Sequence, residues 1–171
     1  MKLIFTTLVV AILLLTFSMC FFKKNDTKNN EQLENENLSF SIVKQITIVQ
    51  LEQELKLLKE NRTEFDFIGI TSNGIDCIYF IKNNGRFQIE FEAILEEQLS
   101  YLEELKKYAE SNGFNYSKTT YGNKTKYKSS ETAPVLCLFT NSDLHQTSEI
   151  AKQIQSKVFN NGELTKYDVV P

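Results

Sequence analysis

The stretch "EFDFIGITSNGIDCIYFIKNNGRFQIEFEAI", residues 64–94, decides the fold of this chain. It contains three runs rich in apolar and aromatic residues, and two Asn-Gly pairs, Asn73-Gly74 and Asn84-Gly85, separate them. Asn-Gly is the preferred two-residue turn of a β-hairpin, because both residues tolerate a positive φ angle. The stretch therefore predicts a meander of three antiparallel strands.

The second and third runs of this stretch predict different degrees of burial. Residues 75–81 are apolar at nearly every position, which predicts a central strand covered at least partly on both faces. The third run alternates between apolar and polar residues, as a strand with one buried face does. The side chains expected to face the core are Phe87, Ile89, Phe91 and Ala93. The side chains expected to face solvent are Gln88, Glu90 and Glu92.

Helical patterns flank the meander on both sides. Apolar residues spaced three and four apart predict one helix within residues 42–61 and a second over residues 94–111. A third helix is expected to begin near Asp143, which forms a capping box with Gln146. The apolar stripe of the first helix is Ile48, Leu51, Leu55 and Leu58. Further strands are expected at residues 116–121 and 135–140, and the tail, residues 164–171, is expected to add an edge strand.

The expected order of elements is α-βββ-α-ββ-α. Antiparallel strands with segregated helices predict an α+β fold of two layers, with a sheet of about five strands. Residues 42–171 have the usual size of one domain, and we expect them to form a single one.

This order of elements resembles the fold of the type III secretion chaperones and their wider relatives. The resemblance covers about 115 residues of this domain and is carried by element order, not by a sequence motif. It implies a small, acidic protein that binds other polypeptides, in a family whose members are often homodimers.

The N-terminal segment, residues 1–22, is apolar from Leu3 to Phe22 and ends at Lys23 and Lys24. A helix of about 20 such residues spans the hydrocarbon core of a bilayer. We therefore expect a retained transmembrane anchor. A bacterial lipoprotein signal with lipidation at Cys20 is the second interpretation, because "LLLTFSMC" places a small residue and a cysteine after an apolar run. Simple cleavage of a secretory signal is the third.

Residues 23–41 are polar and contain few apolar side chains, so we expect a flexible tether between the membrane and the domain. The side of the membrane on which the domain lies stays open. The basic residues that come after the apolar segment favour the cytoplasm, whereas a leader so close to the N-terminus usually exports the domain behind it.

Composition and motifs exclude several functional classes. The net charge of -3 argues against a nucleic-acid partner. No phosphate-binding glycine motif and no metal-binding spacing of cysteine and histidine occurs, so neither a cofactor nor a metal is expected. The single histidine, His145, is expected to be a solvated residue in the first turn of its helix. Cys77 and Cys137 are expected in the core, with a disulfide between them as the alternative.

Two polar groups remain as candidate functional sites. Glu90 and Glu92 lie two residues apart on one strand face, where two carboxylates can divide acid and base roles, although a solvated face is the simpler interpretation. The stretch from residue 116 to residue 128 alternates lysine with tyrosine and carries no acidic residue. Such a surface can bind an anionic partner, although a hairpin rim whose lysines discourage edge pairing is the simpler interpretation. Its candidate residues are Lys118, Lys124, Lys126, Lys128, Tyr121 and Tyr127.

Together these features predict a membrane-tethered module without catalytic residues that binds a protein or peptide partner. The first alternative is an envelope enzyme, hydrolase-like, that uses the carboxylates around Glu90 and Glu92. A structural envelope lipoprotein is the second alternative.

Overall fold

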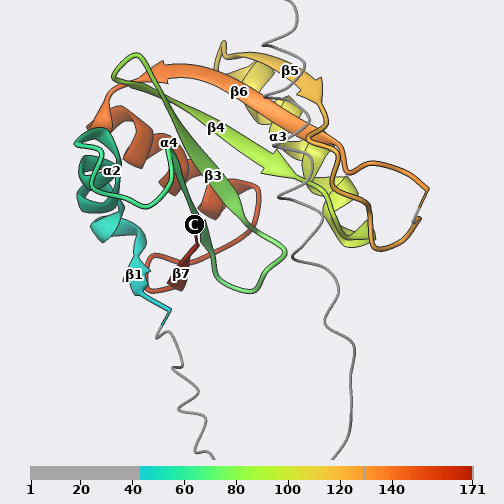
Figure 1. Ribbon diagram of the computed structural model, residues 1–171, viewed down its shortest axis with the longest axis horizontal. Helices are drawn as coiled ribbons and strands as arrows, with labels where there is room; N and C mark the ends of the chain where they lie inside the picture. Colours follow the sequence, from blue (N-terminus) through green and yellow to red (C-terminus); the bar gives the residue numbers. More distant parts are fainter. Residues whose placement is uncertain (1–42, 129, 171) are drawn as a thin grey trace, which may run out of the picture. The chain divides into compact units, whose positions relative to one another are not determined.

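The computed structural model describes residues 43–128 and 130–170 (Figure 1). The predicted membrane segment with Cys20, and the predicted tether, lie outside the described residues. Among the residues that are described, no helix has the length and apolar character needed to cross a membrane.

Seven antiparallel strands form one sheet, in the order β1-β7-β2-β3-β4-β6-β5 (Figure 1). The strands are β1 (Gln45–Thr47), β2 (Phe67–Thr71), β3 (Ile78–Asn83), β4 (Arg86–Glu92), β5 (Asn115–Thr119), β6 (Val135–Ser142) and β7 (Lys166–Val170). The strand β3 lies at the centre of the sheet, as its nearly continuous apolar sequence predicts.

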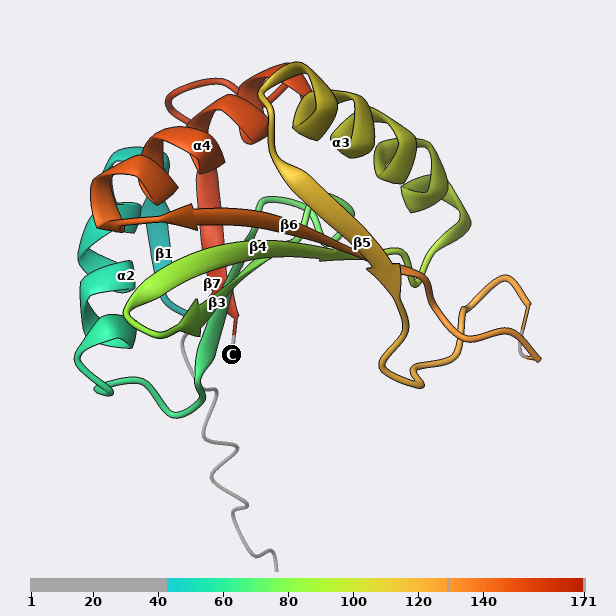
Figure 2. The same ribbon diagram turned by 90° about the horizontal axis from the view of Figure 1, so that it is seen from above.

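The helices α2 (Leu51–Lys59), α3 (Leu99–Ser111) and α4 (Leu144–Lys157) lie on one side of the sheet (Figure 2). Short 3-10 turns, Ile48–Gln50 and Glu96–Gln98, lead into α2 and α3. The predicted start of the last helix is confirmed: the Asp143 carboxylate accepts a hydrogen bond of 2.9 Å from the backbone nitrogen of Gln146. The side chain of Gln146 in turn accepts one from the backbone nitrogen of Asp143.

The hydrophobic core lies between the helices and one face of the sheet. All four residues predicted to face inward from β4 and its end are at most 1% exposed, and the predicted stripe of α2 is at most 3% exposed. From β3 the same core receives Ile78 and Phe80, both fully buried. The core set is completed by side chains from α3 and α4, among them Leu102, Leu105, Ala109, Ala151 and Ile154. The α+β class and the facing of these strands are thus confirmed.

The strand count of about five is wrong, because the sheet has seven strands. The strand β1 was not predicted, and β7 is the strand predicted at the tail. The predicted first helix begins too early in the chain. Residues 45–47 are extended and pair with residues 166–168 of β7, and the helix α2 begins at Leu51. The predicted edge strand at the tail is an interior strand, since β7 pairs with both β1 and β2. These pairings join the two ends of the domain, so local periodicity does not reveal them.

The two Asn-Gly pairs of the meander behave differently. Asn84 and Gly85 both have positive φ angles, 50° and 76°, and form the predicted tight turn between β3 and β4. Asn73-Gly74 does not form a two-residue turn, because residues 72–77 make a longer loop between β2 and β3. The Asp76 carboxylate organises this loop by accepting a hydrogen bond of 2.8 Å from the backbone nitrogen of Ser72.

Candidate functional site

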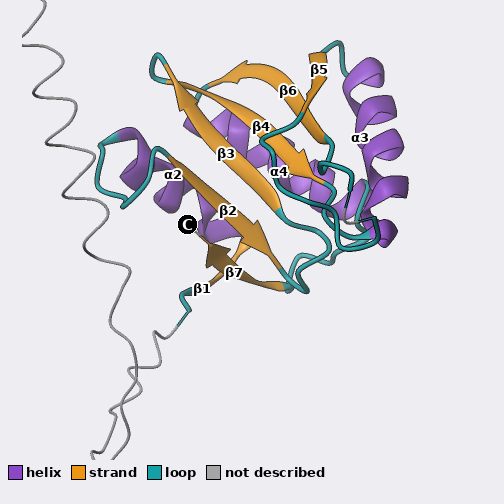
Figure 3. Cartoon of the chain, turned by 45° about the vertical axis from the view of Figure 1, so that its right-hand side comes forward, coloured by secondary structure: helices purple, strands orange, loops and turns teal. Residues whose placement is uncertain are grey.

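The face of the sheet opposite the helices carries the candidate site. Figure 3 shows this open face, with the strands in front of α4. Because side chains alternate along a strand, residues next to the core-facing ones point to the open face. Tyr79 and Ile81 of β3 do so between the buried Ile78 and Phe80, and both are only partly buried. No described helix covers this face, so the open face is where the sheet meets solvent.

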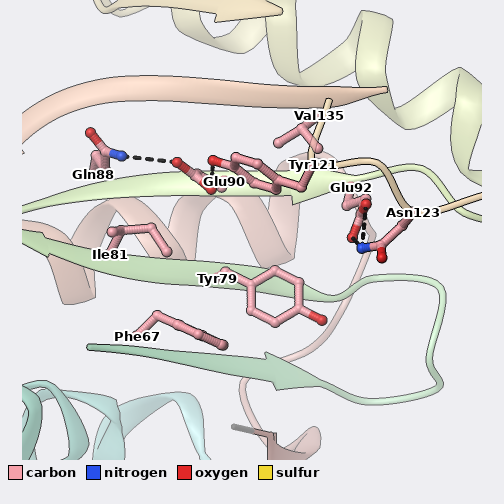
Figure 4. Close-up of a pocket in the computed structure, with 9 residues that line it drawn as sticks. All are labelled: Phe67, Tyr79, Ile81, Gln88, Glu90, Glu92, Tyr121, Asn123 and Val135. Carbon is pink, nitrogen blue, oxygen red and sulfur yellow. Dashed lines mark hydrogen bonds between the residues drawn. The ribbon is translucent and has the colours of Figure 1, made fainter. Parts of the chain in front are cut away.

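A half-open pocket of about 480 Å³ lies on the open face (Figure 4). Its volume falls within the range of about 300–1,000 Å³ that is typical of ligand sites. Four strands and the loop after β5 supply its walls. The residues that line it are Phe67, Tyr79, Ile81, Gln88, Glu90, Glu92, Tyr121, Asn123 and Val135.

Glu90 lies at the side of this pocket and is only 5% exposed, so the expectation of a solvated carboxylate is wrong for this residue. The hydroxyl of Tyr121 donates a hydrogen bond of 2.6 Å to Oε2, and Nε2 of Gln88 donates one of 2.9 Å to Oε1 (Figure 4). The thiol of Cys137 on the neighbouring strand β6 donates to Oε1 at 3.4 Å. Three neutral donors thus satisfy a nearly buried carboxylate.

Glu92 is half-buried at the other end of the pocket. Nδ2 of Asn123 lies 2.9 Å and 3.1 Å from its two carboxylate oxygens, so one amide donates to both (Figure 4). The two carboxylates therefore belong to one pocket but have separate sets of donors.

The loop between β5 and β6 places Tyr121 and Asn123 over the open face. It is held by backbone hydrogen bonds from Ala133 to Asn123 and from Lys126 to Ile94. Thr125 is 4% exposed, and its hydroxyl donates to the Lys128 carbonyl at 2.6 Å. Tyr121 and Asn123 of the lysine-rich stretch thus form one wall of the pocket, and its lysines do not line it.

Aromatic rings line the lower side of the pocket. Phe67 meets Tyr79 edge-on, with ring centroids 6.0 Å apart, and Phe65 stacks on Phe67 at 5.5 Å. Burial and the neighbouring Cys77 raise the pKa of Tyr79 well above its ordinary value. Burial and the hydrogen bond to Glu90 do the same for the pKa of Tyr121. Both phenols are therefore neutral hydrogen-bond donors at physiological pH.

The predicted lysine and tyrosine surface is divided by the sheet. Lys118 lies on the helix side, where its Nζ is 2.9 Å from the Glu103 carboxylate. Lys128 pairs with Glu131 at 3.2 Å in the loop. Lys124 and Lys126 are exposed in the same loop and Tyr127 is partly buried there, whereas Tyr121 turns to the open face. Five of the six residues thus lie in this loop, with Tyr121 turned to the open face, and anion binding there stays a prediction.

The remaining reactive side chains to be placed are those of His145, Cys77 and Cys137. The side chain of His145 is 75% exposed, as expected, and its Nδ1 lies 3.3 Å from the Glu52 carboxylate. Burial raises the pKa of the Cys77 thiol to about 11, and burial together with Glu90 raises that of Cys137. Both cysteines are free thiols, Cys137 buried and Cys77 partly buried. Within the described residues, no three His, Cys, Asp or Glu side chains are grouped to hold a metal ion.

Sequence reasoning missed most of the pocket. Phe67, Asn123 and Val135 gave no individual signal, because their role depends on strands and loops that pair over long distances. The sequence signal that could have indicated the pocket is the apolar character of β3 on both faces. Tyr79 and Ile81 place apolar side chains on a face that no described helix covers. Glu90 and Glu92 were noted as a pair, and they do line the pocket together.

Neither the scan against protein-family models nor the searches of curated proteins and of solved structures found a match to this chain. Arguments about its function therefore depend on the geometry of the open face.

Proposed function

We propose that this protein is a membrane-tethered module without catalytic residues, and that the open face of its sheet binds a protein or peptide partner. The observation that carries the proposal is the pocket of about 480 Å³ on a sheet face that no described helix covers. Its walls combine apolar side chains with a few polar groups that are already oriented by hydrogen bonds. This combination is typical of surfaces that bind ligands or partners.

Exposed aromatic side chains extend the open face beyond the pocket. Phe65 is 44% exposed beside Phe67, and Phe139 is 46% exposed on β6. Large rings at the surface are enriched in protein interfaces, because they bury much area and lose little side-chain entropy. A partner that covers the pocket would also cover these rings.

The membrane tether is part of the proposal and is supported by the apolar run of residues 3–22 and the polar residues 23–41. A retained helix is preferred, and a lipid on Cys20 is the alternative. The intact mass of the protein purified from membranes distinguishes a full-length chain, a diacylglycerol adduct and a trimmed chain. Recovery of a trimmed chain from the aqueous fraction would contradict the tether.

Site-specific photocrosslinking of the full-length protein in cells tests the binding surface. A benzophenone side chain placed at Phe65 or Phe139 should give a discrete adduct, and the same group at the exposed Val49 should not. The substitution Ile81→Ser, inside the pocket, should reduce the adduct by at least about fivefold, as a loss of about 1 kcal/mol in binding does. The matched substitution Val49→Ser should leave it unchanged.

An adduct that forms equally from Val49, or that survives Ile81→Ser undiminished, would remove the open face as the binding surface. For the proposal to hold, mass spectrometry must identify the crosslinked partner as a polypeptide.

A hydrolase-like envelope enzyme is the second candidate, because the pocket contains two carboxylates. Glu90 and Glu92 would then divide the acid and base roles. Turnover of p-nitrophenyl glycosides or esters by the purified protein, lost in both Glu90→Gln and Glu92→Gln, would favour this candidate over a binding module.

A further inference from the structure

We infer that the pocket binds a basic side chain of the partner, arginine in preference to lysine. This inference rests on the proposed function of the open face and names the chemistry that the face recognises. It follows from the charge of the pocket, from its aromatic walls and from its size.

The charge of the pocket is negative, and no cationic side chain lines it. Glu90 and Glu92 are its two charged residues, and neither lysine nor arginine lines it. Among the described residues, no ion pair reaches either carboxylate. Moving a carboxylate out of water is costly, and neutral donors offset only part of that cost. A cation that enters the pocket would offset more of it, so the pocket favours a positively charged ligand.

The aromatic side chains favour a flat cation. Phe67, Tyr79 and Tyr121 line the same pocket as the two carboxylates (Figure 4). A cation over an aromatic face gains about 0.5–2 kcal/mol, depending on how far it is desolvated. The guanidinium group is planar, stacks on rings and donates two parallel hydrogen bonds to a carboxylate. Lysine offers the charge without the plane, so arginine suits these walls better.

The pocket, at about 480 Å³, has room for one long side chain of an extended peptide segment. The apolar residues Ile81 and Val135 line the same pocket as the acids, so they can cover the methylene groups of a long basic side chain. The neighbouring exposed rings, Phe65 and Phe139, can contact apolar residues beside the basic one. The expected recognition element is a basic residue flanked by aromatic or aliphatic ones.

A neighbouring lysine competes for part of this charge. A smaller pocket of about 110 Å³ shares Tyr79 and Glu92 with the main pocket and is lined by Lys126. The positive charge of Lys126 reduces the attraction of Glu92 for an incoming cation. Replacing it with glutamine should therefore strengthen the binding of a basic ligand by about twofold to fivefold, as a loss of weak repulsion at a partly exposed site does.

The test uses fluorescent derivatives of acetyl-Phe-X-Phe-amide, where X is arginine, lysine, citrulline or glutamate. Citrulline matches arginine in shape and lacks its charge. Binding to the full-length protein in detergent micelles is followed by fluorescence anisotropy. The arginine peptide should bind about tenfold more tightly than the citrulline peptide, with lysine between them and glutamate weakest. The preference should shrink as salt is added.

Two variants assign the preference to the pocket. Glu90→Gln and Glu92→Gln should each reduce the arginine-to-citrulline ratio to less than about threefold, the reduction expected when one of two attracting charges is lost. Val49→Ser, on the other side of the sheet, should keep the full ratio. Because Glu90→Gln removes a nearly buried charge, thermal unfolding of each variant is measured first. If Glu90→Gln does not fold, the arginine-to-citrulline ratio of Glu92→Gln decides, since Glu92 is only half-buried.

The outcomes separate this inference from the proposed function. Equal affinity for arginine and citrulline, or no affinity for any of the peptides, overturns the inference, and crosslinking from Phe65 and Phe139 then still decides the proposed function. A clear arginine preference without any crosslinked polypeptide supports the cation site and contradicts the protein or peptide partner.

Discussion

The two faces of the sheet use the same strands for different purposes. On β4, the inward residues Phe87, Ile89 and Phe91 are at most 1% exposed and pack against helices. On the same strand, Gln88, Glu90 and Glu92 point the other way and line the pocket. One face is thus held by apolar packing against the helices. The other face carries a few polar groups with specific hydrogen-bond partners.

This difference shows where stability and recognition reside. Burial of apolar area contributes roughly 25 cal/mol per Å², so the helix side dominates the free energy of folding. The open face keeps half-buried rings and two carboxylates that form no ion pair among the described residues, so it contributes less to folding and leaves binding energy available. Substitutions on the two faces should therefore separate the unfolding free energy from ligand affinity.

The largest expected effect comes from adjacent residues of β3 that face opposite ways. Phe80 is fully buried, and Phe80→Ala should lower the free energy of unfolding by about 3–5 kcal/mol, because it leaves a cavity. Ile81→Ala, on the open face, should cost about 1 kcal/mol, since its side chain is only partly buried. Urea unfolding followed by circular dichroism measures both. Equal costs would mean that the open face is covered as tightly as the core.

Asp76 should give the next largest effect, because it joins three parts of the chain. Its carboxylate is 2% exposed and accepts hydrogen bonds from Thr71 at 2.7 Å, from Ser72 at 2.6 Å and from Asn161 at 2.6 Å. Asp76→Asn places an amide donor against these donors and should cost about 1–3 kcal/mol at pH 7. The exposed Asp66 provides the control, since Asp66→Asn should change stability by less than about 0.5 kcal/mol.

The pH dependence of stability gives an independent check on Asp76. Burial alone would raise its pKa, but the hydrogen bonds from Ser72, Thr71 and Asn161 outweigh burial and lower the pKa below 3.8. A carboxyl group whose pKa is lowered by folding stabilises the protein fully above its unfolded pKa, and this contribution is lost as the pH falls further. The gap between wild type and Asp76→Asn should therefore narrow below about pH 4. A gap that stays constant from pH 6 to about pH 3 would contradict this role.

The comparison also explains which features the sequence could predict. The inward residues of β4 and the stripe of α2 follow local periods of two and of three to four, so they were predictable. The burial of Glu90 depends on Tyr121, which lies 31 residues further along the chain. The bond from Asn161 to Asp76 spans 85 residues, and the pairing of Gln45 in β1 with Asp168 in β7 spans 123 residues. Features that join remote segments leave no local period.

Gly69 on β2 lies opposite Tyr79 on β3, and its substitution should have a smaller effect on stability than that of Asp76. A Cβ atom there would lie 2.7 Å from Cγ2 of Val170 and 2.9 Å from the ring of Tyr79. Gly69→Ala should cost about 1–2 kcal/mol, because both side chains must shift. The ring of Tyr79 is then displaced within the pocket, so the affinity for the arginine peptide should fall as well.

A matched glycine tests this explanation. Gly162 has open space around its Cα, so Gly162→Ala should leave both stability and peptide affinity within error. Thermal unfolding and anisotropy measure the two quantities on the same samples. A stable Gly69→Ala protein with unchanged affinity would show that Tyr79 is not held by the close approach of Gly69.

The smallest effect on stability is expected for Tyr121→Phe, although Tyr121 makes the shortest hydrogen bond to Glu90. Tyr121 is 60% exposed, so water can replace its hydroxyl at Oε2, and the cost should stay below about 1 kcal/mol. Its effect on recognition should be larger in proportion, because the hydroxyl orients the carboxylate that the guanidinium meets. The arginine-to-citrulline ratio should fall by about twofold to fourfold. Tyr127→Phe is the control, since Tyr127 does not line the pocket. A Tyr121→Phe protein that loses several kcal/mol of stability and keeps its arginine preference would contradict this argument. It would mean that the bond from Tyr121 to Glu90 stabilises the fold and does not contribute to ligand binding.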